Sequence, residues 1–179
     1  LHGANEKNIP WVLNRSAQEK FFDLLDEYND ESFTIGGETY LPKSAFIEEK
    51  DIKGTIHNHS TYSDGIHSLK EMAEASKKSG YEYFVITDHS QSSVLAKGLK
   101  YDELRKQWHE IDELNKSYSD FTILKGIECD ILANGDLDYE KPILEKFDLV
   151  ISSIHIAFNM DMAKATNRMI KAIENPFTN

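Results

Sequence analysis

The segment DIKGTIHNHSTYSDGIHSLKEMAEASKKSGYEYFVITDH, residues 51–89, contains the pattern that decides the fold. An apolar stretch over 52–57 predicts a buried strand. A capping box, Ser68–Glu71, then predicts a helix that runs to Gly80, where glycine favours a helix end. A second strand is predicted over 83–87. This strand–helix–strand unit indicates parallel strands joined by a right-handed crossover.

The same alternation continues to the end of the chain. Asp102 is expected to cap a helix that reaches about Tyr118. Strands are expected over 122–128 and 148–154, with a short helical turn at 143–147 after Pro142. Apolar side chains predict the inner face of the first helix at Leu104, Trp108, Ile111 and Leu114. Asn159 or Asp161 is expected to open a last helix, whose predicted inner face holds Met162, Ala165, Met169 and Ile173. The pattern favours a parallel α/β fold, either an open doubly wound sheet or a barrel.

The first fifty residues have a different pattern. A capping box, Ser16–Glu19, predicts a helix over about 16–28, and the glycines at 36–37 and Pro42 then indicate turns. We therefore predict a lead-in segment over 1–50 and an α/β domain over 51–179. A chain of 179 residues, 40% of them hydrophobic, is long enough for one such domain with its own core.

Composition restricts the functional classes. No apolar run approaches the ~20 residues of a membrane span, and the start of the chain lacks the pattern of a secretory signal. The single cysteine, Cys129, excludes an internal disulfide and fits a reducing compartment such as the cytoplasm. The net charge of −11 argues against nucleic-acid binding, unless bound metals offset the acids or a basic module elsewhere supplies affinity.

Each predicted strand ends in residues of the types that commonly bind metals, histidine, aspartate or glutamate. His57 and His59 follow the first strand, Asp88 and His89 the second, while Glu128 ends the third and His155 the fourth. In α/β folds the carboxyl ends of parallel strands form the functional face. A lone histidine at a strand end is usually structural, but here four strands agree. The other histidines lie elsewhere: His2 near the start, His67 in an ambiguous place before a helix, and His109 within a helix as a surface residue.

Spacing and chemistry support a multinuclear site. His57 and His59 are two apart, so in an extended segment both side chains point to one side. Asp64 lies in a turn sequence that can fold back over the strand end. Mixed imidazole and carboxylate ligands suit zinc, manganese or iron, and Glu128 could bridge two ions. Adjacent divalent ions suit the hydrolysis of phosphate esters.

Four segments resemble, in order, the motifs of the PHP (polymerase and histidinol phosphatase) family: 54–65, 86–89, 126–131 and 152–155. Further segments resemble the C-terminal PHP domain of bacterial family X DNA polymerases, at 81–83, 96–99, 110–115, 130–132, 135–139 and 171–176. The resemblance covers about Asp51 to Asn179 and does not extend to the first fifty residues.

The resemblance implies a distorted (β/α)7 barrel with up to three divalent metals. His57 and His59 would bind the first metal, Glu128 would bridge it to a second held by His155, and Asp64 and His89 would hold the third. Asp88 would orient a ligand. The implied activity is a manganese-dependent 3′–5′ exonuclease or 3′-end processing enzyme in DNA repair. The implied partners are single-stranded or gapped DNA 3′ ends and the polymerase domains of a parent chain.

The motifs that close the family pattern, a His-Pro-Gly-Arg-like segment and Asp-x-His, do not occur before Asn179. The resemblance then implies one missing ligand for each metal and a partial barrel of about four strands with an open edge. We expect a truncated chain, or a second copy that covers this edge. Two alternative functions stay open: a phosphomonoesterase for substrates such as histidinol phosphate, and a non-catalytic structural remnant.

Overall fold

A computed structural model describes residues 33–35, 38–40 and 47–179 of the chain. The chain divides into two units, Leu1–Ile52 and Lys53–Asn179. In the first unit, β1 (Phe33–Ile35) pairs antiparallel with β2 (Glu38–Tyr40), and a short 3-10 helix, η3, spans Glu49–Asp51. The helix expected over 16–28 lies outside the described residues.

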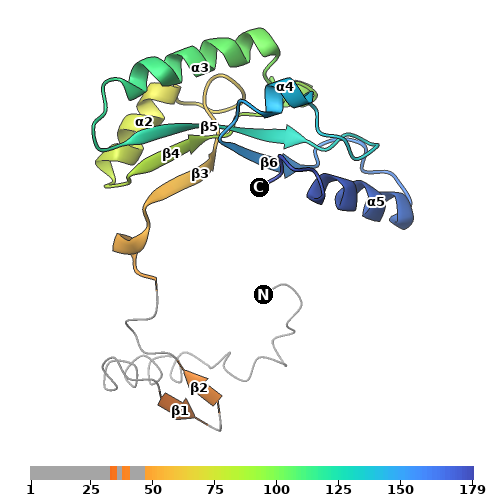
Figure 1. The fold of residues 1–179 in the computed structure, drawn as a ribbon, viewed down its shortest axis with the longest axis horizontal. Helices are drawn as coiled ribbons and strands as arrows, with labels where there is room; N and C mark the ends of the chain where they lie inside the picture. The colour runs from red at the N-terminus through yellow and green to blue at the C-terminus, as the bar shows by residue number, and fades with distance from the viewer. Residues whose placement is uncertain (1–32, 36–37, 41–46) are drawn as a thin grey trace. The chain divides into compact units, whose positions relative to one another are not determined.

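The second unit is an α/β fold built on four parallel strands. These strands are β3 (Gly54–Asn58), β4 (Tyr83–Ile86), β5 (Thr122–Asp130) and β6 (Leu149–Ser153), and they neighbour one another in chain order. The first half of β5 pairs with β4 and its second half with β6. Such a stagger tilts successive strands and curls the sheet into a half-barrel (Figure 1). The expected partial barrel with outer helices is confirmed.

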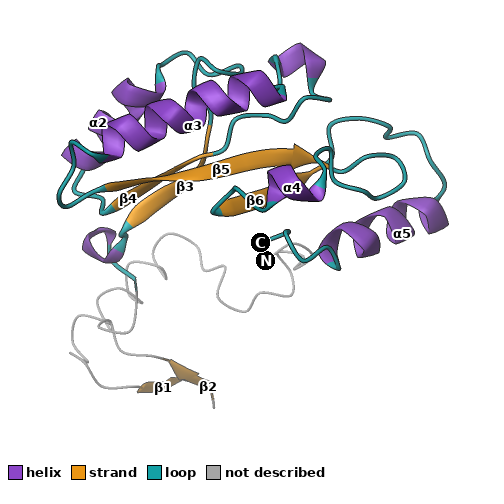
Figure 2. Cartoon of the chain, turned by 45° about the horizontal axis from the view of Figure 1, so that its top comes forward, coloured by secondary structure: helices purple, strands orange, loops and turns teal. Residues whose placement is uncertain are grey.

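Helices connect these strands on the outside of the sheet: α2 (Leu69–Lys78), α3 (Tyr101–Asn115) and α4 (Lys141–Leu144). A further helix, α5 (Met162–Ile173), follows the last strand. Figures 1 and 2 both show α2 and α3 side by side on one face of the sheet. Leu104 and Ile111 of α3 are fully buried with Phe84 and Ile86 of β4, as the apolar spacing predicted. Burial of one such side chain stabilises the fold by ~1.5–3 kcal/mol. None of the helices in the described ranges is long and apolar enough to cross a membrane.

Local chemistry explains the confirmed helix ends. Ser68 Oγ accepts the Glu71 N–H at 3.2 Å, and the Glu71 carboxylate accepts the Ser68 N–H at 2.8 Å. At the other end of α2, Gly80 has a φ of +87° and its N–H donates to Lys77 O. The next amide, from Tyr81, donates to Ser76 O, which completes a Schellman motif.

The boundaries of two helices, α3 and α4, were predicted wrongly. Lys100, not Asp102, is the N-cap of α3, because the Glu103 carboxylate reaches back to the Lys100 N–H at 2.8 Å. That helix ends at Asn115 rather than Tyr118. Pro142 lies inside the first turn of α4, where its missing N–H needs no partner, so this helix begins earlier than expected.

The first strand and the last helix are less buried than the sequence predicted. β3 is an edge strand with only β4 beside it in the sheet, and its Ile56 is 53% exposed. On α5 the buried residues are Arg168 and Ala172, whereas Met162, Met169 and Ile173 are exposed. Asp161 does cap this helix, since its carboxylate accepts the Lys164 N–H at 2.9 Å. The apolar spacing therefore identified the helix but not the side that packs.

Candidate metal centre

The expected metal-binding residues meet at the carboxyl ends of the four parallel strands. His57 lies in β3 and His59 just after it, while His89 follows β4 and forms a parallel bridge with Glu128 of β5. His155 lies two residues beyond the end of β6. Each of the four neighbouring strands thus brings at least one imidazole or carboxylate to the same edge of the sheet, and β3 brings two.

Glu128 is the centre of this cluster. It is 4% exposed, and four imidazoles surround its carboxylate. The distances to its oxygens are 3.3 Å from His57 Nε2, 3.4 Å from His59 Nε2, 3.2 Å from His89 Nδ1 and 3.3 Å from His155 Nε2. A buried carboxylate with no Lys or Arg ion pair in the described ranges is unfavourable unless another cation compensates it.

Asp64 extends the cluster on the side of His59 and His89. Its carboxylate oxygens lie 3.5 Å from His59 Nδ1 and 3.6 Å from His89 Nε2. Asp64 is half exposed, so this side of the cluster opens to solvent. Three groups of potential ligand atoms result, each with all its atoms within 4.8 Å of one another: His57/His59/Glu128, His59/Asp64/His89 and His89/Glu128/His155.

The side chains of His57 and His59 are brought together by a backbone conformation that the sequence analysis did not predict. Their rings are 5.5 Å apart between centroids. His57, however, has a φ of +63°, and the pairing of β3 with β4 shifts register between Thr55 and Asn58. A left-handed non-glycine residue is strained, and such strain tends to occur at functional sites. The bulge, not a regular two-residue alternation, turns His57 toward Glu128.

The donor set fits divalent transition metals. Nδ1 of His59 and Nδ1 of His89 are both buried and have no hydrogen-bond partner among the described residues. Burial, and then repulsion from His89, lowers the pKa of His59 and so favours the neutral imidazole that binds metals. Unpaired buried imidazole nitrogens next to carboxylates are the arrangement that manganese, zinc or iron would satisfy.

Asp88 lies behind the cluster rather than against an imidazole. Its buried carboxylate accepts hydrogen bonds from Ser60 N–H, Ser60 Oγ, Ser63 Oγ and Gln107 Nε2, at 2.5–2.7 Å. Burial raises the pKa of Asp88, and the bonds from Ser63 and Ser60 oppose that shift. Asp88 therefore fixes the turn between His59 and Asp64, which carries two of the candidate ligands.

Asp130 is a functional candidate that the sequence analysis did not single out. It is fully buried at the end of β5, and its Oδ1 lies 2.6 Å from His155 Nδ1. The other oxygen accepts a bond of 2.6 Å from Ser92 Oγ. The position of Asp130 two residues after Glu128, on the same side of a strand, was the available signal.

Arg168 is the second residue that was missed. It is buried on α5, and its guanidinium donates to four backbone carbonyl groups. These belong to Ile131, Leu132, Ile156 and Ala157. They follow Asp130 and His155 directly, so Arg168 ties together the two segments that carry this pair. An arginine in the middle of a helix is expected to be a surface residue, and no sequence pattern around Arg168 indicated that it is buried.

The remaining histidines do not join the cluster. His67 and His109 are exposed and belong to none of the ligand groups, and the prediction that His109 is a surface residue is confirmed. His2 lies outside the described residues.

Comparison with known proteins shows the family to which this chain belongs. The family model described as PHP domain matches residues 55–175, so the chain belongs to the PHP domain family. It is 48% identical over 138 residues to a DNA polymerase/3′-5′ exonuclease PolX of Bacillus subtilis, an alignment that covers 77% of this chain and 24% of that protein. It is 32% identical over 126 residues to a probable phosphatase of Thermoanaerobacter, covering 68% of this chain and 49% of the relative. The chain thus spans about a quarter of the first relative and about half of the second.

Proposed function

We propose that this chain binds two or three divalent metal ions and hydrolyses phosphodiester bonds at the 3′ ends of DNA. The observation that carries this proposal is the buried Glu128 carboxylate, with four imidazoles 3.2–3.4 Å from its oxygens. A carboxylate in that position can share its two oxygens between neighbouring ions. Manganese is the proposed metal for activity, with zinc or iron as alternatives.

The assignment of ligands follows the groups of side chains. We propose His57, His59 and Glu128 for one ion, Glu128 and His155 for a second, and Asp64 and His89 for a third. The three groups of ligand atoms support this scheme. In addition, His59 lies near the proposed third ion site and His89 near the proposed second. Asp88 is proposed as a positioning residue that acts through the Ser60–Ser63 turn.

The residues at and next to the candidate metal centre have distinct roles in the proposed reaction. When bound, adjacent divalent ions supply an acidified water nucleophile and neutralise charge on the attacking and leaving oxygens. Asp130 holds the proton of His155 on Nδ1, so that Nε2 is free to bind. Asp64, half exposed, lies where a substrate phosphate can approach from solvent. The single thiol of the chain, Cys129, is a poor competing nucleophile, because burial raises its pKa to about 12.

The choice of DNA as substrate rests on the Bacillus relative, whose name includes a 3′-5′ exonuclease. We propose by the same reasoning that the chain works in the cytoplasm beside polymerase domains. A phosphomonoesterase is the second candidate, because several relatives are named probable phosphatases.

The deciding experiment uses a 5′-labelled single-stranded oligonucleotide with manganese, beside the variant His57→Ala/His59→Ala. Stepwise shortening by the parent chain alone supports the exonuclease. A parallel assay with histidinol phosphate tests the phosphomonoesterase. Activity on neither substrate, with no manganese bound in calorimetry, would mean a structural module that keeps only part of its site.

A further inference from the structure

The segment between β4 and α3 forms a closed loop whose base adjoins His89. The Leu99 N–H donates to His89 O at 2.8 Å, and Ser90 and Leu99 form a parallel bridge. Within this base Gly98 packs against the backbone so closely that a Cβ atom there would lie 1.7 Å from Ser90 O. We call residues 91–98 the 91–98 loop. Its position relative to His89 is therefore fixed at both ends.

The 91–98 loop is also fastened to the groups behind His155. Ser92 Oγ donates to Asp130 Oδ2 at 2.6 Å, and the Ser92 N–H donates to Asp138 Oδ2 at 2.7 Å. Gln91 Nε2 donates to Asp138 O at 2.8 Å. These bonds place the loop beside the metal centre as a fixed neighbour.

The outer surface of this loop is apolar and cationic. Its tip is the 3-10 helix η4 (Val94–Ala96), in which Leu95 is fully exposed. Lys97 and Lys100 are exposed, and neither forms an ion pair with any described carboxylate. Lys97 and Lys100 therefore place two positive charges next to the candidate site of a chain whose net charge is −11.

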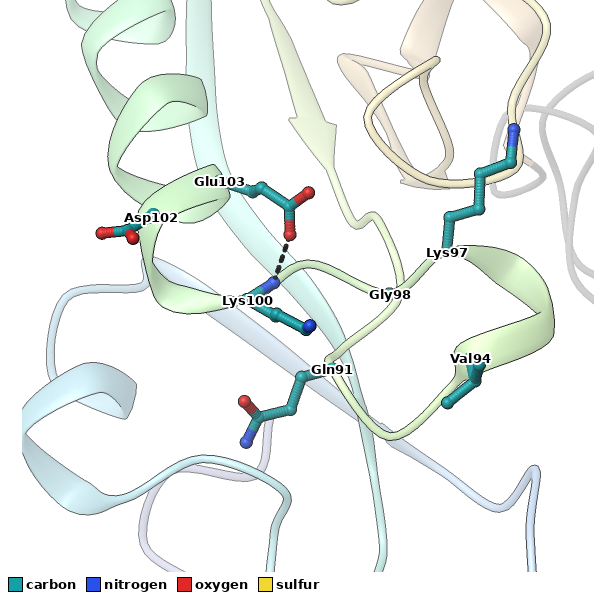
Figure 3. A pocket seen from close by; sticks show the side chains of 7 residues that line it. All are labelled: Gln91, Val94, Lys97, Gly98, Lys100, Asp102 and Glu103. Atoms are coloured by element: carbon teal, nitrogen blue, oxygen red, sulfur yellow. Dashed lines mark hydrogen bonds between the residues drawn. The ribbon is translucent and has the colours of Figure 1, made fainter.

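A pocket of about 480 Å³ lies between this loop and the start of α3, lined on the loop side by Gln91, Val94 and Gly98 (Figure 3). The two acids that also line it, Asp102 and Glu103, lie at the start of α3 and keep their negative charge there. Glu103 accepts the Lys100 N–H, and Asp102 points away from the loop in Figure 3. An anion is therefore expected on the loop side of the pocket, near the lysines, and not at the helix end.

Chain geometry places this surface within a few nucleotides of the metal centre. Leu99 is the bridge partner of Ser90, and Lys100 is the next residue. With ~5 Å between paired strands and 3.8 Å between successive Cα atoms, Lys100 lies within about 9 Å of Ser90, measured between Cα atoms. Nucleotides rise by ~3.4 Å along each strand of a duplex and lie further apart in an extended single strand, so this distance corresponds to at most about three nucleotides.

We propose that Lys97 and Lys100, with the exposed tip of the 91–98 loop, bind the phosphate backbone of a single nucleic-acid strand near the bond that is cut. This inference rests on the proposed function and names a second contact surface for the same substrate. The lysines contact phosphates, and the aliphatic side chains of the tip lie against bases. The surface positions the strand and takes no part in bond cleavage.

The test measures binding without turnover. Fluorescence anisotropy of a labelled single-stranded oligonucleotide is recorded over a series of potassium chloride concentrations, with calcium in place of manganese. The variant is Lys97→Gln/Lys100→Gln. Loss of two phosphate contacts should make the slope of log K against log salt shallower by about 1.4, at ~0.7 for each contact to a single strand.

The matched control is Lys78→Gln/Lys116→Gln, which removes the same charge at the opposite ends of α2 and α3. The control should keep the slope of the parent chain. An equal change in both variants, an unchanged slope in the loop variant, or no measurable binding by the parent chain would each overturn the inference. Hydrolysis by the parent chain is scored separately, so the proposed function can stand when this inference fails.

Discussion

The buried carboxylate of Asp130 and the Nδ1 atom of the partly exposed His155 lie 2.6 Å apart in a hydrogen bond. An ionised carboxylate can only accept, so the proton of the imidazole is on Nδ1 and Nε2 carries the lone pair, with Ser153 Oγ 3.3 Å away. That nitrogen lies 3.3 Å from Glu128 Oε1. The pair therefore prepares His155 to bind a metal ion next to Glu128.

Replacing Asp130 should weaken metal binding at His155 while the other candidate ligands keep their places. We expect Asp130→Ala to lower manganese affinity by about 10- to 100-fold, as is typical when the partner of a ligand histidine is removed. Asp130→Asn should lose less, because its amide oxygen can still accept from Nδ1. Isothermal titration with manganese measures both changes.

The control for this prediction is Asp136→Asn, which alters an exposed carboxylate 2.8 Å from Lys171 Nζ. Its manganese affinity should equal that of the parent chain. Equal affinities for the parent chain and Asp130→Ala would show that His155 binds no metal or needs no partner.

Arg168 should help to position Asp130 and His155 by holding the backbone segments that follow them. Lysine cannot span the four carbonyl groups that the guanidinium holds, so Arg168→Lys should loosen the segments after Asp130 and His155. We expect manganese affinity to fall about 10-fold. Urea unfolding should show that the free energy of unfolding falls by about 1–3 kcal/mol, because buried carbonyl groups lose hydrogen-bond partners. Arg105→Lys, at an exposed site on α3, is the control. Lower stability with unchanged affinity would limit Arg168 to a role in folding.

Asp88 should tolerate an amide but not an apolar side chain. Gln107 Oε1 is buried without a hydrogen-bond partner, so a flip of this amide would let it accept from an asparagine at position 88. We expect Asp88→Asn to change the free energy of unfolding by less than about 1 kcal/mol. Asp88→Leu should lose about 2–4 kcal/mol, because several buried donors lose their acceptor. Urea unfolding of both variants in EDTA separates this effect from metal binding. A large loss in Asp88→Asn would contradict the flip.

Gly65 should be essential for placing Asp64. A Cβ atom at this position would lie 2.1 Å from His59 O, which is backbone and cannot rotate away. Gly65→Ala should therefore move the turn and lower manganese affinity by at least about 10-fold, with a stability loss of about 1–3 kcal/mol. Ile66→Ala, next to it and almost fully exposed, should have no effect. Equal titrations of the two variants would show that the turn moves without disturbing the ligands.

The sequence predicted most of this fold because its signals were local. The capping box at Ser68 and Glu71 and the glycine at position 80 act within one turn of helix, so they were readable without the sheet. Burial depends on neighbours that the sequence does not order. The edge position of β3 left Ile56 exposed, and the small contact face of α5 left Met162 and Met169 exposed.

The candidate ligands were predictable for a similar reason. Imidazoles and carboxylates at the ends of parallel strands meet at one edge whatever the details of packing. Asp130, which is 0% exposed, had one signal in the sequence, its position two residues after Glu128. Arg168 was not predictable, because its role depends on burial: it looks like a surface charge in the sequence but is 3% exposed. The bulge that turns His57 inward was likewise invisible, since it arises from the register between β3 and β4.

Metal binding should also appear as thermal stability. Removing cations with EDTA leaves Glu128 buried without compensation, whereas added manganese binds only the folded cluster. At a hundredfold excess over the dissociation constant, binding to one site stabilises the fold by about 2.7 kcal/mol. The melting temperature of the parent chain should therefore rise with manganese, by about 2–4 °C for each kcal/mol in a domain of this size.

The variant Glu128→Gln should lose most of this shift. In EDTA it should melt at or above the temperature of the parent chain, because it no longer buries an uncompensated carboxylate. If manganese shifts the parent chain and Glu128→Gln equally, the ions bind elsewhere and Glu128 is not a ligand.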